Sequence, residues 1–364
     1  MKRMIKSHNS LATATKAPMC PARADFRWNP HLDRLEQLQA WIEARRPGAA
    51  FELVPASADA SFRRYFRVRY ADGASLIAMD APPANEDCRP FIHVAGLLAA
   101  AGLNAPCVEA EDLAQGFLLL TDLGDTTYLA AMNADRNLAG KLFDDATTAL
   151  VRWQLASRPD VLPPYDAALL RRELDLFPDW YVARHLGIEL APAQRALLER
   201  TFALVITANL AQPQVFVHRD YMPRNLMVCN PNPGVLDFQD AVYGPITYDV
   251  ASLFRDAFVS WDEENVLDWT VRYWEKARQA GLPVPAEFAN FYRDFEWMGL
   301  QRHLKVLGIF ARLKYRDGKR GYLEDTPRFL AYVRAVAARY RDLQPLLLLF
   351  DELEGRSAGV GYTF

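Results

Sequence analysis

Four polar residues near the middle of the chain have the types and the spacing that phosphate chemistry needs. His218, Asp220 and Asn225 stand in the segment VFVHRDYMPRNLMV, and Asp237 stands in the segment GVLDFQD. Each lies close to the end of an apolar run, where a loop can present it from a rigid scaffold. Two acids, an amide and a histidine gathered in this way make these segments the candidate site.

The spacing between Asn225 and Asp237 predicts that the two residues meet. The apolar runs 226–228 and 235–236 flank the turn-rich connector CNPNPG, a pattern that favours a β-hairpin. Antiparallel pairing of these runs places Asn225 within about 5 Å of Asp237 at the Cα level. An amide oxygen and a carboxylate then converge on one point, and this donor pair suits Mg²⁺ completed by substrate phosphates.

Asp220 faces the same point without being needed as a metal ligand. A carboxylate placed there suits the base that accepts a hydroxyl proton during phosphoryl transfer. The alternative, that Asp220 and Asp237 only cap turns, leaves the concentration of polar groups on one hairpin unexplained. For His218 we expect a structural role, in which the ring packs against the loop and hydrogen-bonds it.

The elements that must position these residues change in character along the chain. In the first third, amphipathic helical spacing combines with short β-prone runs that are separated by turns. These patterns predict helices over 32–46 and 91–101 and strands over 51–54, 61–70, 75–79 and 116–121. After residue 125 the predicted helices are 138–157, 167–185, 192–211, 250–258, 266–280, 286–313 and 327–341.

These elements predict an α+β, bilobal fold with a small β-rich N-lobe and a larger, mostly helical C-lobe. The expected parts are a flexible N-terminal extension (1–24), an N-lobe (25–121), a hinge (122–125) and a C-lobe that carries the polar motifs (126–364). A transit peptide is the alternative for the extension, because residues 1–24 lack acidic side chains.

Composition excludes several classes of function. Of 364 residues, 51% are hydrophobic, which is enough apolar material for sizeable cores. The formal net charge of −3 lacks the basic excess of nucleic-acid binding, and no apolar run is long enough to cross a bilayer. The four cysteines are scattered, as in a reduced cytoplasmic protein. We expect a cytoplasmic enzyme with no nucleic-acid, membrane or obligate protein partner.

The motifs HRDYMPRN and DFQD resemble the catalytic loop and the metal-binding motif of the aminoglycoside phosphotransferase and choline kinase-like family. That family has the protein-kinase-like bilobal fold, and the resemblance extends from about Phe26 to the C-terminus. It implies Asp220 as catalytic base, Asn225 and Asp237 as Mg²⁺ ligands, and Asp249 as a brace of the catalytic loop. ATP is the implied phosphate donor.

Further segments resemble the hinge of this family and one of its subgroups. FLLLTDLGD is similar to the family's hinge, which implies that the backbone at Thr121 and Leu123 meets adenine. ASFRRYFRV, MDAPPANEDCRPF and GLQRHLKVLGIFARL resemble a subgroup of bacterial cell-wall recycling kinases. Members of this subgroup phosphorylate the C1 hydroxyl of N-acetylmuramate and N-acetylglucosamine, so the resemblance implies a small-molecule sugar substrate.

The N-lobe departs from the kinase pattern, because no lysine that could hold the phosphates occurs between Lys16 and Lys141. Arginine can bind phosphate bidentately, and four arginines crowd the first hairpin. Of these we favour Arg64 as the phosphate-binding residue. Alternate residues of a strand point to opposite faces of the sheet, so the alternative for any one of these arginines is an exposed strand residue. The preceding turn has no glycine-rich pattern, so phosphate contact there rests on Ser61 and backbone amides.

The late helices suggest the charge of the substrate. The run 293–320 holds eight basic residues and three acidic ones, which favours an anionic or neutral sugar over a polycationic aminoglycoside. The expected sugar-binding residues are Arg302, His303 and Trp297. The alternatives are a solvated basic helix face and aromatic side chains that belong to the core. The rival functions are a kinase of another small alcohol, such as choline or an aminoglycoside, and an inactive pseudokinase that only binds ligands.

Overall fold

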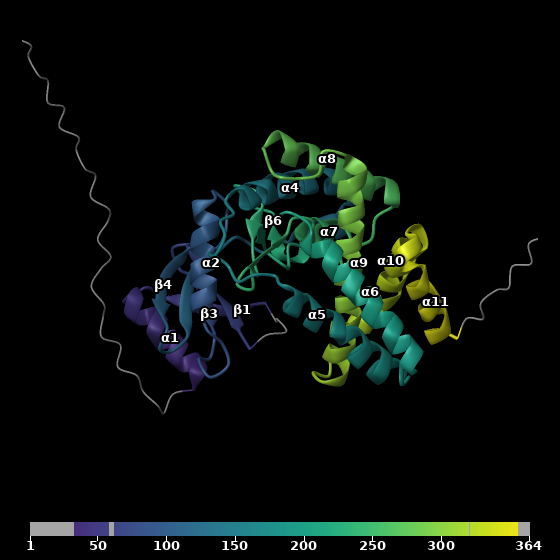
Figure 1. Ribbon diagram of the computed structural model, residues 1–364. Helices are drawn as coiled ribbons and strands as arrows, with labels where there is room; N and C mark the ends of the chain where they lie inside the picture. Colours follow the sequence, from purple (N-terminus) through teal and green to yellow (C-terminus); the bar gives the residue numbers. More distant parts are fainter. Residues whose placement is uncertain (1–32, 58–61, 320, 356–364) are drawn as a thin grey trace, which may run out of the picture.

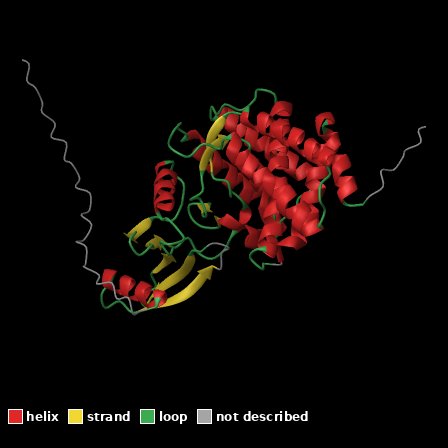
Figure 2. Ribbon diagram, turned by 60° about the horizontal axis from the view of Figure 1, so that its bottom comes forward, coloured by secondary structure: helices red, strands yellow, loops and turns green. Residues whose placement is uncertain are grey.

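The structure is a computed structural model that describes residues 33–57, 62–319 and 321–355. The predicted N-terminal extension, 1–24, lies outside these residues. The sheet and its two helices form one side of the molecule and the helices that follow form the other (Figures 1 and 2). The predicted α+β, bilobal fold is confirmed, whereas the residue limits of its lobes and hinge stay predictions.

The first part is built on a five-stranded antiparallel sheet in the order β1-β2-β3-β5-β4. Its strands are β1 (Phe51–Ser57), β2 (Arg64–Tyr70), β3 (Ser75–Asp80), β4 (Val108–Asp112) and β5 (Phe117–Thr121). The predicted strands are all present, but β4 was not expected. Strand β4 pairs with β5 at one edge of the sheet. Its sequence, VEAED, has too few apolar residues to show the alternation that predicts a strand.

One helix covers each face of this sheet. Helix α1 (Arg34–Arg45) starts at a capping box formed by Asp33 and Glu36, and it buries Trp41 against one face. Helix α2 (Arg89–Ala100) buries its apolar stripe against the other face. Because alternate residues of a strand point to opposite faces, Leu119 packs with α1 while Leu118 packs with α2.

The second part is mostly helical and surrounds the long helix α9. Its helices are α3 (Tyr128–Ala134), α4 (Ala139–Leu155), α5 (Ala167–Leu176), α6 (Pro192–Leu210), α7 (Tyr248–Phe254), α8 (Glu263–Gln279), α9 (Phe288–Tyr315), α10 (Thr326–Arg339) and α11 (Gln344–Leu353). Helices α3 and α11 were not predicted. The predicted helix 167–185 divides instead into α5 and a π-helix (Phe177–Leu186), with Pro178 near the junction.

Two short antiparallel pairs of strands in this part hold the polar motifs. Strand β6 (Gln214–Val217) pairs with β9 (Val242–Pro245), and β7 (Leu226–Met227) pairs with β8 (Gly234–Val235). Among the described helices, none is both long and apolar enough to span a membrane.

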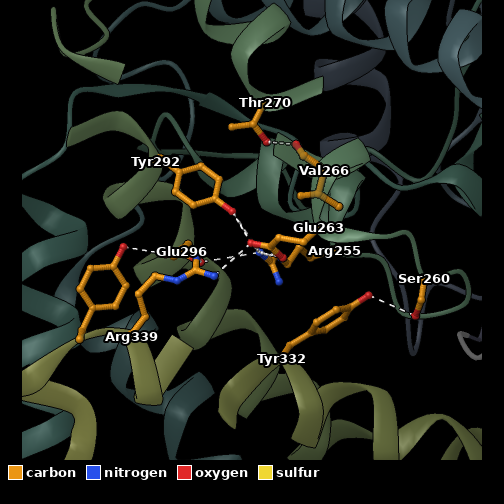
Figure 3. Close-up of polar contacts among 10 residues, drawn as sticks. Arg255, Ser260, Glu263, Val266, Thr270, Tyr292, Glu296, Tyr332 and Arg339 are labelled. Carbon is orange, nitrogen blue, oxygen red and sulfur yellow. Dashed lines mark hydrogen bonds and ion pairs between the residues drawn. The ribbon is translucent and has the colours of Figure 1, made fainter. Parts of the chain in front are cut away.

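A cluster of charged side chains joins Arg255, which directly follows α7, to α8, α9 and α10 (Figure 3). Arg255 contacts Glu263 at 3.1 Å and the buried Glu296 at 3.7 Å. Arg339 contacts Glu263 at 3.2 Å and also pairs with Glu296, while the Tyr292 hydroxyl donates to Glu263 at 2.6 Å. These contacts hold three helices and the end of α7 together, so we assign the cluster a structural role.

Candidate active site

The loop that follows β6 holds His218, Arg219 and Asp220, and buried Asp249 fixes its start. The carboxylate of Asp249 accepts hydrogen bonds from the backbone N–H of His218 at 2.7 Å and of Arg219 at 3.0 Å. Burial raises the pKa of Asp249 to about 7, although both amide bonds oppose this rise. The contacts match the bracing role that the resemblance implies. Arg219 has a φ of 75°, a sparsely populated conformation that Asp249 helps to hold.

His218 fixes the next residue of the loop. Its Nδ1 accepts a hydrogen bond from the backbone N–H of Asp220 at 3.2 Å. Burial lowers the pKa of His218 to about 4, so its imidazole is neutral at neutral pH and keeps Nδ1 as an acceptor. These contacts agree with the structural role expected for His218.

The hairpin brings Asn225 and Asp237 together as the spacing predicted. Leu226 of β7 pairs with Val235 of β8, and the N–H of Leu236 donates to the carbonyl of Asn225 at 2.9 Å. The side chains meet one position further along, where Asn225 Nδ2 lies 3.3 Å from Asp237 Oδ2.

The donor atoms of this pair fit a hard divalent cation. Asn225 Nδ2 donates to the backbone carbonyl of Asp220 at 3.0 Å, which fixes the amide and leaves its oxygen as a metal donor. Gln239 Nε2 donates to Asp237 Oδ1 at 2.9 Å, so the carboxylate is also oriented. Among the described residues, no group of three His, Cys, Asp or Glu side chains is arranged to hold a metal. A Mg²⁺ ion at Asn225 and Asp237 therefore requires further oxygens, such as those of nucleotide phosphates.

A cavity of about 520 Å³ contains this site, and both parts of the chain line it. Asp220, Asn225 and Asp237 are among its lining residues. The end next to the sheet is largely apolar, with Ala56, Tyr65, Ile77, Pro106, Leu120, Thr121, Leu123 and Leu236, and it also holds the ion pair of Arg67 with Asp122. The end next to α9 is aromatic and basic and is lined by Arg224, Tyr248, Phe258, Arg302, Lys305, Val306, Ile309, Phe310 and Tyr322.

A buried ion-pair network lies behind the α9 end. Glu173 of α5 pairs with Lys305 at 2.8 Å and with Arg219 at 2.5 Å, and it also accepts from the Tyr165 hydroxyl. Burial opposes ionisation of Glu173, but the two cations outweigh burial and lower its pKa to about 2. Lys305 Nζ also donates to the Tyr248 hydroxyl at 3.0 Å. The network links the catalytic loop to the cavity wall on α9.

Residues 52–288 match the model of a family described as "Phosphotransferase enzyme family". The chain belongs to this family.

Relatives of this phosphotransferase with the name "N-acetylmuramate/N-acetylglucosamine kinase" cover most of its length. The relative from Pseudomonas aeruginosa is 53% identical over 323 residues, which cover 86% of this chain and 95% of the relative. The relative from Neisseria meningitidis is 51% identical over 336 residues, covering 92% and 100% of the two chains. A more distant relative from Caulobacter vibrioides is 32% identical over 316 residues.

Solved structures with little sequence identity share the fold. A choline/ethanolamine kinase family protein from Mesorhizobium loti has a TM-score of 0.59 at 13% identity, with 86% of this chain and 99% of that chain covered. The choline kinase of Streptococcus pneumoniae has a TM-score of 0.56 at 12% identity, with 84% and 100% covered. At these identities the likeness supports the bilobal kinase-like fold alone.

Of the four predicted nucleotide-binding residues of the phosphotransferase, two line the cavity, one lies outside the described residues and one does not line the cavity. Thr121 and Leu123 line the cavity, and their contact with adenine stays a prediction. Ser61 lies outside the described residues. The choice of Arg64 needs correction, because this residue does not line the cavity and binds buried Asp80 at 2.9 Å instead.

Strand alternation explains the misplacement of Arg64. Tyr65 and Arg67 point from β2 into the cavity, so Arg64 points to the other face. Arg67 binds Asp122 with two hydrogen bonds, at 2.7 and 3.1 Å, and donates to the carbonyl of Gly124 at 2.6 Å. Arg67 thus fastens the sheet to segment 122–125.

Of the predicted sugar-binding residues, the structure brings only Arg302 into the cavity. His303 stacks on Tyr332 at 4.8 Å between ring centroids, and Trp297 packs against Tyr340. The prediction for these two residues is therefore corrected to core packing. On a helix, neighbours in sequence diverge by about 100°, so His303 cannot share the cavity face of Arg302.

Sequence reasoning missed Lys305, Arg224 and the aromatic residues around them. Helical spacing offered a signal for Lys305, because residues three apart on α9 share one face with Arg302. Arg224 stands within the catalytic motif, directly before Asn225. No local pattern pointed to Phe258 or Tyr322, which come to the cavity from segments distant in sequence.

Proposed function

We propose that this phosphotransferase transfers the γ-phosphoryl group of ATP, with Mg²⁺, to the C1 hydroxyl of N-acetylmuramate and N-acetylglucosamine. The observation that carries the proposal is that Asp220, Asn225 and Asp237 line one cavity together with apolar residues next to the sheet and aromatic and basic residues near α9. The names of relatives at 51–53% identity support the sugars. The C1 position rests on the resemblance of the sequence to the cell-wall recycling kinases.

In the proposed reaction Asp220 is the catalytic base. Its carboxylate accepts the proton of the C1 hydroxyl while the hydroxyl oxygen bonds to the γ-phosphorus and the bond to ADP breaks. The chain orients Asp220 from both sides, because its N–H donates to His218 and its carbonyl accepts from Asn225. Such pre-orientation is the main contribution that a kinase makes to phosphoryl transfer.

Asn225 and Asp237 would hold the magnesium ion that the donor nucleotide brings. When bound, the ion neutralises charge on the phosphates. The apolar end of the cavity would take adenine, with Ile77 and Leu236 against the base and backbone groups at Thr121 and Leu123 at its edge. The aromatic end would take the sugar, whose ring can stack on an aromatic face.

We also propose that the enzyme works in the cytoplasm, where ATP is present. The three cysteines of the described chain, Cys88, Cys107 and Cys229, are free thiols, which is compatible with a reducing compartment.

The test is a panel of acceptors incubated with the enzyme, ATP and Mg²⁺. The panel contains N-acetylmuramate, N-acetylglucosamine, glucose, choline and kanamycin, and mass spectrometry identifies the products. We expect a mass increase of one phosphate on the two amino sugars. Phosphorylation of choline or kanamycin alone would favour the rival kinases, and ATP binding without any product would favour a pseudokinase.

A further inference from the structure

Arg224 lies in the candidate site, but it has no role in the proposed reaction. It lies in the catalytic loop, four residues after Asp220 and directly before Asn225, and its side chain lines the cavity. Its guanidinium lies over the Phe258 ring, 4.9 Å from the centroid, which holds it against the wall. Within the described chain Arg224 forms no ion pair with an acidic side chain.

The other cations of the cavity wall are paired with acids or buried. Arg67 is paired with Asp122 at 2.7 Å, and Lys305 is paired with Glu173 at 2.8 Å. Arg302 is buried and donates to the backbone carbonyl of Arg255 at 3.4 Å. Of the cations that line the described cavity, Arg224 is therefore the one that is neither paired with an acid nor buried, and it can meet a negative charge on a ligand.

The aromatic contacts of Arg224 place it at the sugar end. Phe258, on which it lies, contacts Phe310 at 6.4 Å and Tyr322 at 6.5 Å between ring centroids. These rings belong to the wall near α9, whereas residues proposed to contact adenine, such as Ile77 and Thr121, come from the sheet. A sugar whose C1 hydroxyl reaches Asp220 would bring its other ring substituents toward this wall.

We propose that Arg224 binds the carboxylate of an anionic sugar and so sets the preference of the enzyme for N-acetylmuramate over N-acetylglucosamine. The inference rests on the proposed function. The two sugars differ in the lactyl ether of N-acetylmuramate, which carries one carboxylate. A guanidinium matches a carboxylate with two parallel hydrogen bonds, and this geometry rewards the charged sugar alone.

The test compares kcat and KM for both sugars at saturating Mg·ATP in the wild type and in Arg224→Gln. We expect kcat/KM for N-acetylmuramate to fall roughly 10- to 100-fold, mainly through KM, as for the loss of a charge-assisted hydrogen bond. The fall for N-acetylglucosamine is expected to be at least tenfold smaller. Arg224→Lys should give an intermediate loss, because lysine keeps the charge without the fork.

Arg200→Gln serves as the matched control, because Arg200 is exposed on α6 and does not line the cavity. It should leave both sugars unaffected. An equal loss for both sugars in Arg224→Gln, above all with a raised KM for ATP, would overturn the inference and assign Arg224 to the phosphates. No loss for either sugar would also overturn it. If the wild type phosphorylates neither sugar, the proposed function itself is wrong. If the wild type phosphorylates both sugars but Arg224→Gln lowers kcat/KM equally for both or for neither, only the inference on Arg224 is wrong.

Discussion

Asp220, Asn225 and Asp237 depend on one another through the backbone between them. Asn225 donates from its side chain to the carbonyl of Asp220 and lies 3.3 Å from the carboxylate of Asp237. A substitution at one position therefore acts on a shared arrangement, yet we assign the three side chains different tasks. Substitutions that change one atom can separate proton acceptance from metal binding.

We predict that Asp220→Asn and Asp237→Asn fail in different ways. The amide at position 220 cannot accept the hydroxyl proton, so kcat should fall by roughly 10²- to 10⁴-fold while Mg·ATP still binds. The amide at position 237 weakens a metal ligand, so the Mg²⁺ concentration for half-maximal rate should rise at least about tenfold. Magnesium titrations of initial rate and calorimetric nucleotide binding measure both effects. Equal behaviour of the two variants would contradict the assignment.

A second prediction concerns buried His218 and pH. Above pH 6.5 the ring is neutral in both the folded and the unfolded chain. Below 6.5 the unfolded chain takes up a proton that the folded chain refuses until about pH 4, because burial lowers the pKa of His218 to about 4. This histidine should therefore cost roughly 3 kcal/mol of stability as the pH falls from 6.5 to 4.

His218→Asn is the variant that measures this cost. Its side-chain oxygen can accept from the N–H of Asp220 but does not titrate, so the free energy of unfolding should fall less steeply than in the wild type over this pH range. Urea unfolding at several pH values gives both curves. Parallel curves between pH 6.5 and 4 would exclude a buried neutral His218.

Among the elements, the β7–β8 hairpin and helix α9 differ in how far the sequence predicted them. The meeting of Asn225 with Asp237 follows from local spacing, because a short hairpin leaves little freedom of register. The sequence of α9 did not show which face of the helix lines the cavity. The helix is apolar on more than one face, because it packs against α5, the π-helix, α6, α7 and α10. His303 and Trp297 were therefore assigned to the wrong side.

Gly308 of α9 provides a prediction at this scale. A Cβ atom there would lie 2.3 Å from the backbone carbonyl carbon and oxygen of Leu176, where α5 meets the π-helix. Backbone cannot move aside as a side chain can, so Gly308→Ala should lower the free energy of unfolding by about 1–3 kcal/mol or more. Denaturant unfolding measures the change.

Gly299 of the same helix is the matched control. A Cβ there would lie 3.5 Å from His303 Cε1, which is an ordinary contact. Because alanine favours helix by about 1 kcal/mol over glycine, Gly299→Ala should be neutral or stabilising. If both alanine variants lost the same stability, the close approach of α9 to Leu176 would not be the cause.

At the scale of the whole molecule, the cavity joins residues that no local pattern connects. The change from β-prone runs to helical spacing predicted two lobes, and the structure has them. Which side chains meet between the lobes depends on tertiary packing. Arg67 reaches Asp122 across 55 positions of sequence, and Phe258 reaches Tyr322 from another segment. The meeting of Asp220, Asn225 and Asp237 was therefore predictable from one stretch of sequence, whereas the cavity wall near α9 was not.

The position of the phosphate on the product tests the central proposal most directly. Wild-type enzyme is incubated with ATP, Mg²⁺ and N-acetylglucosamine or N-acetylmuramate, and the purified product is examined by ¹H and ³¹P NMR. We predict coupling between phosphorus and the proton on C1, together with loss of the product in Asp220→Asn. A phosphate on any other carbon, or the same product at an undiminished rate in Asp220→Asn, would contradict the proposal.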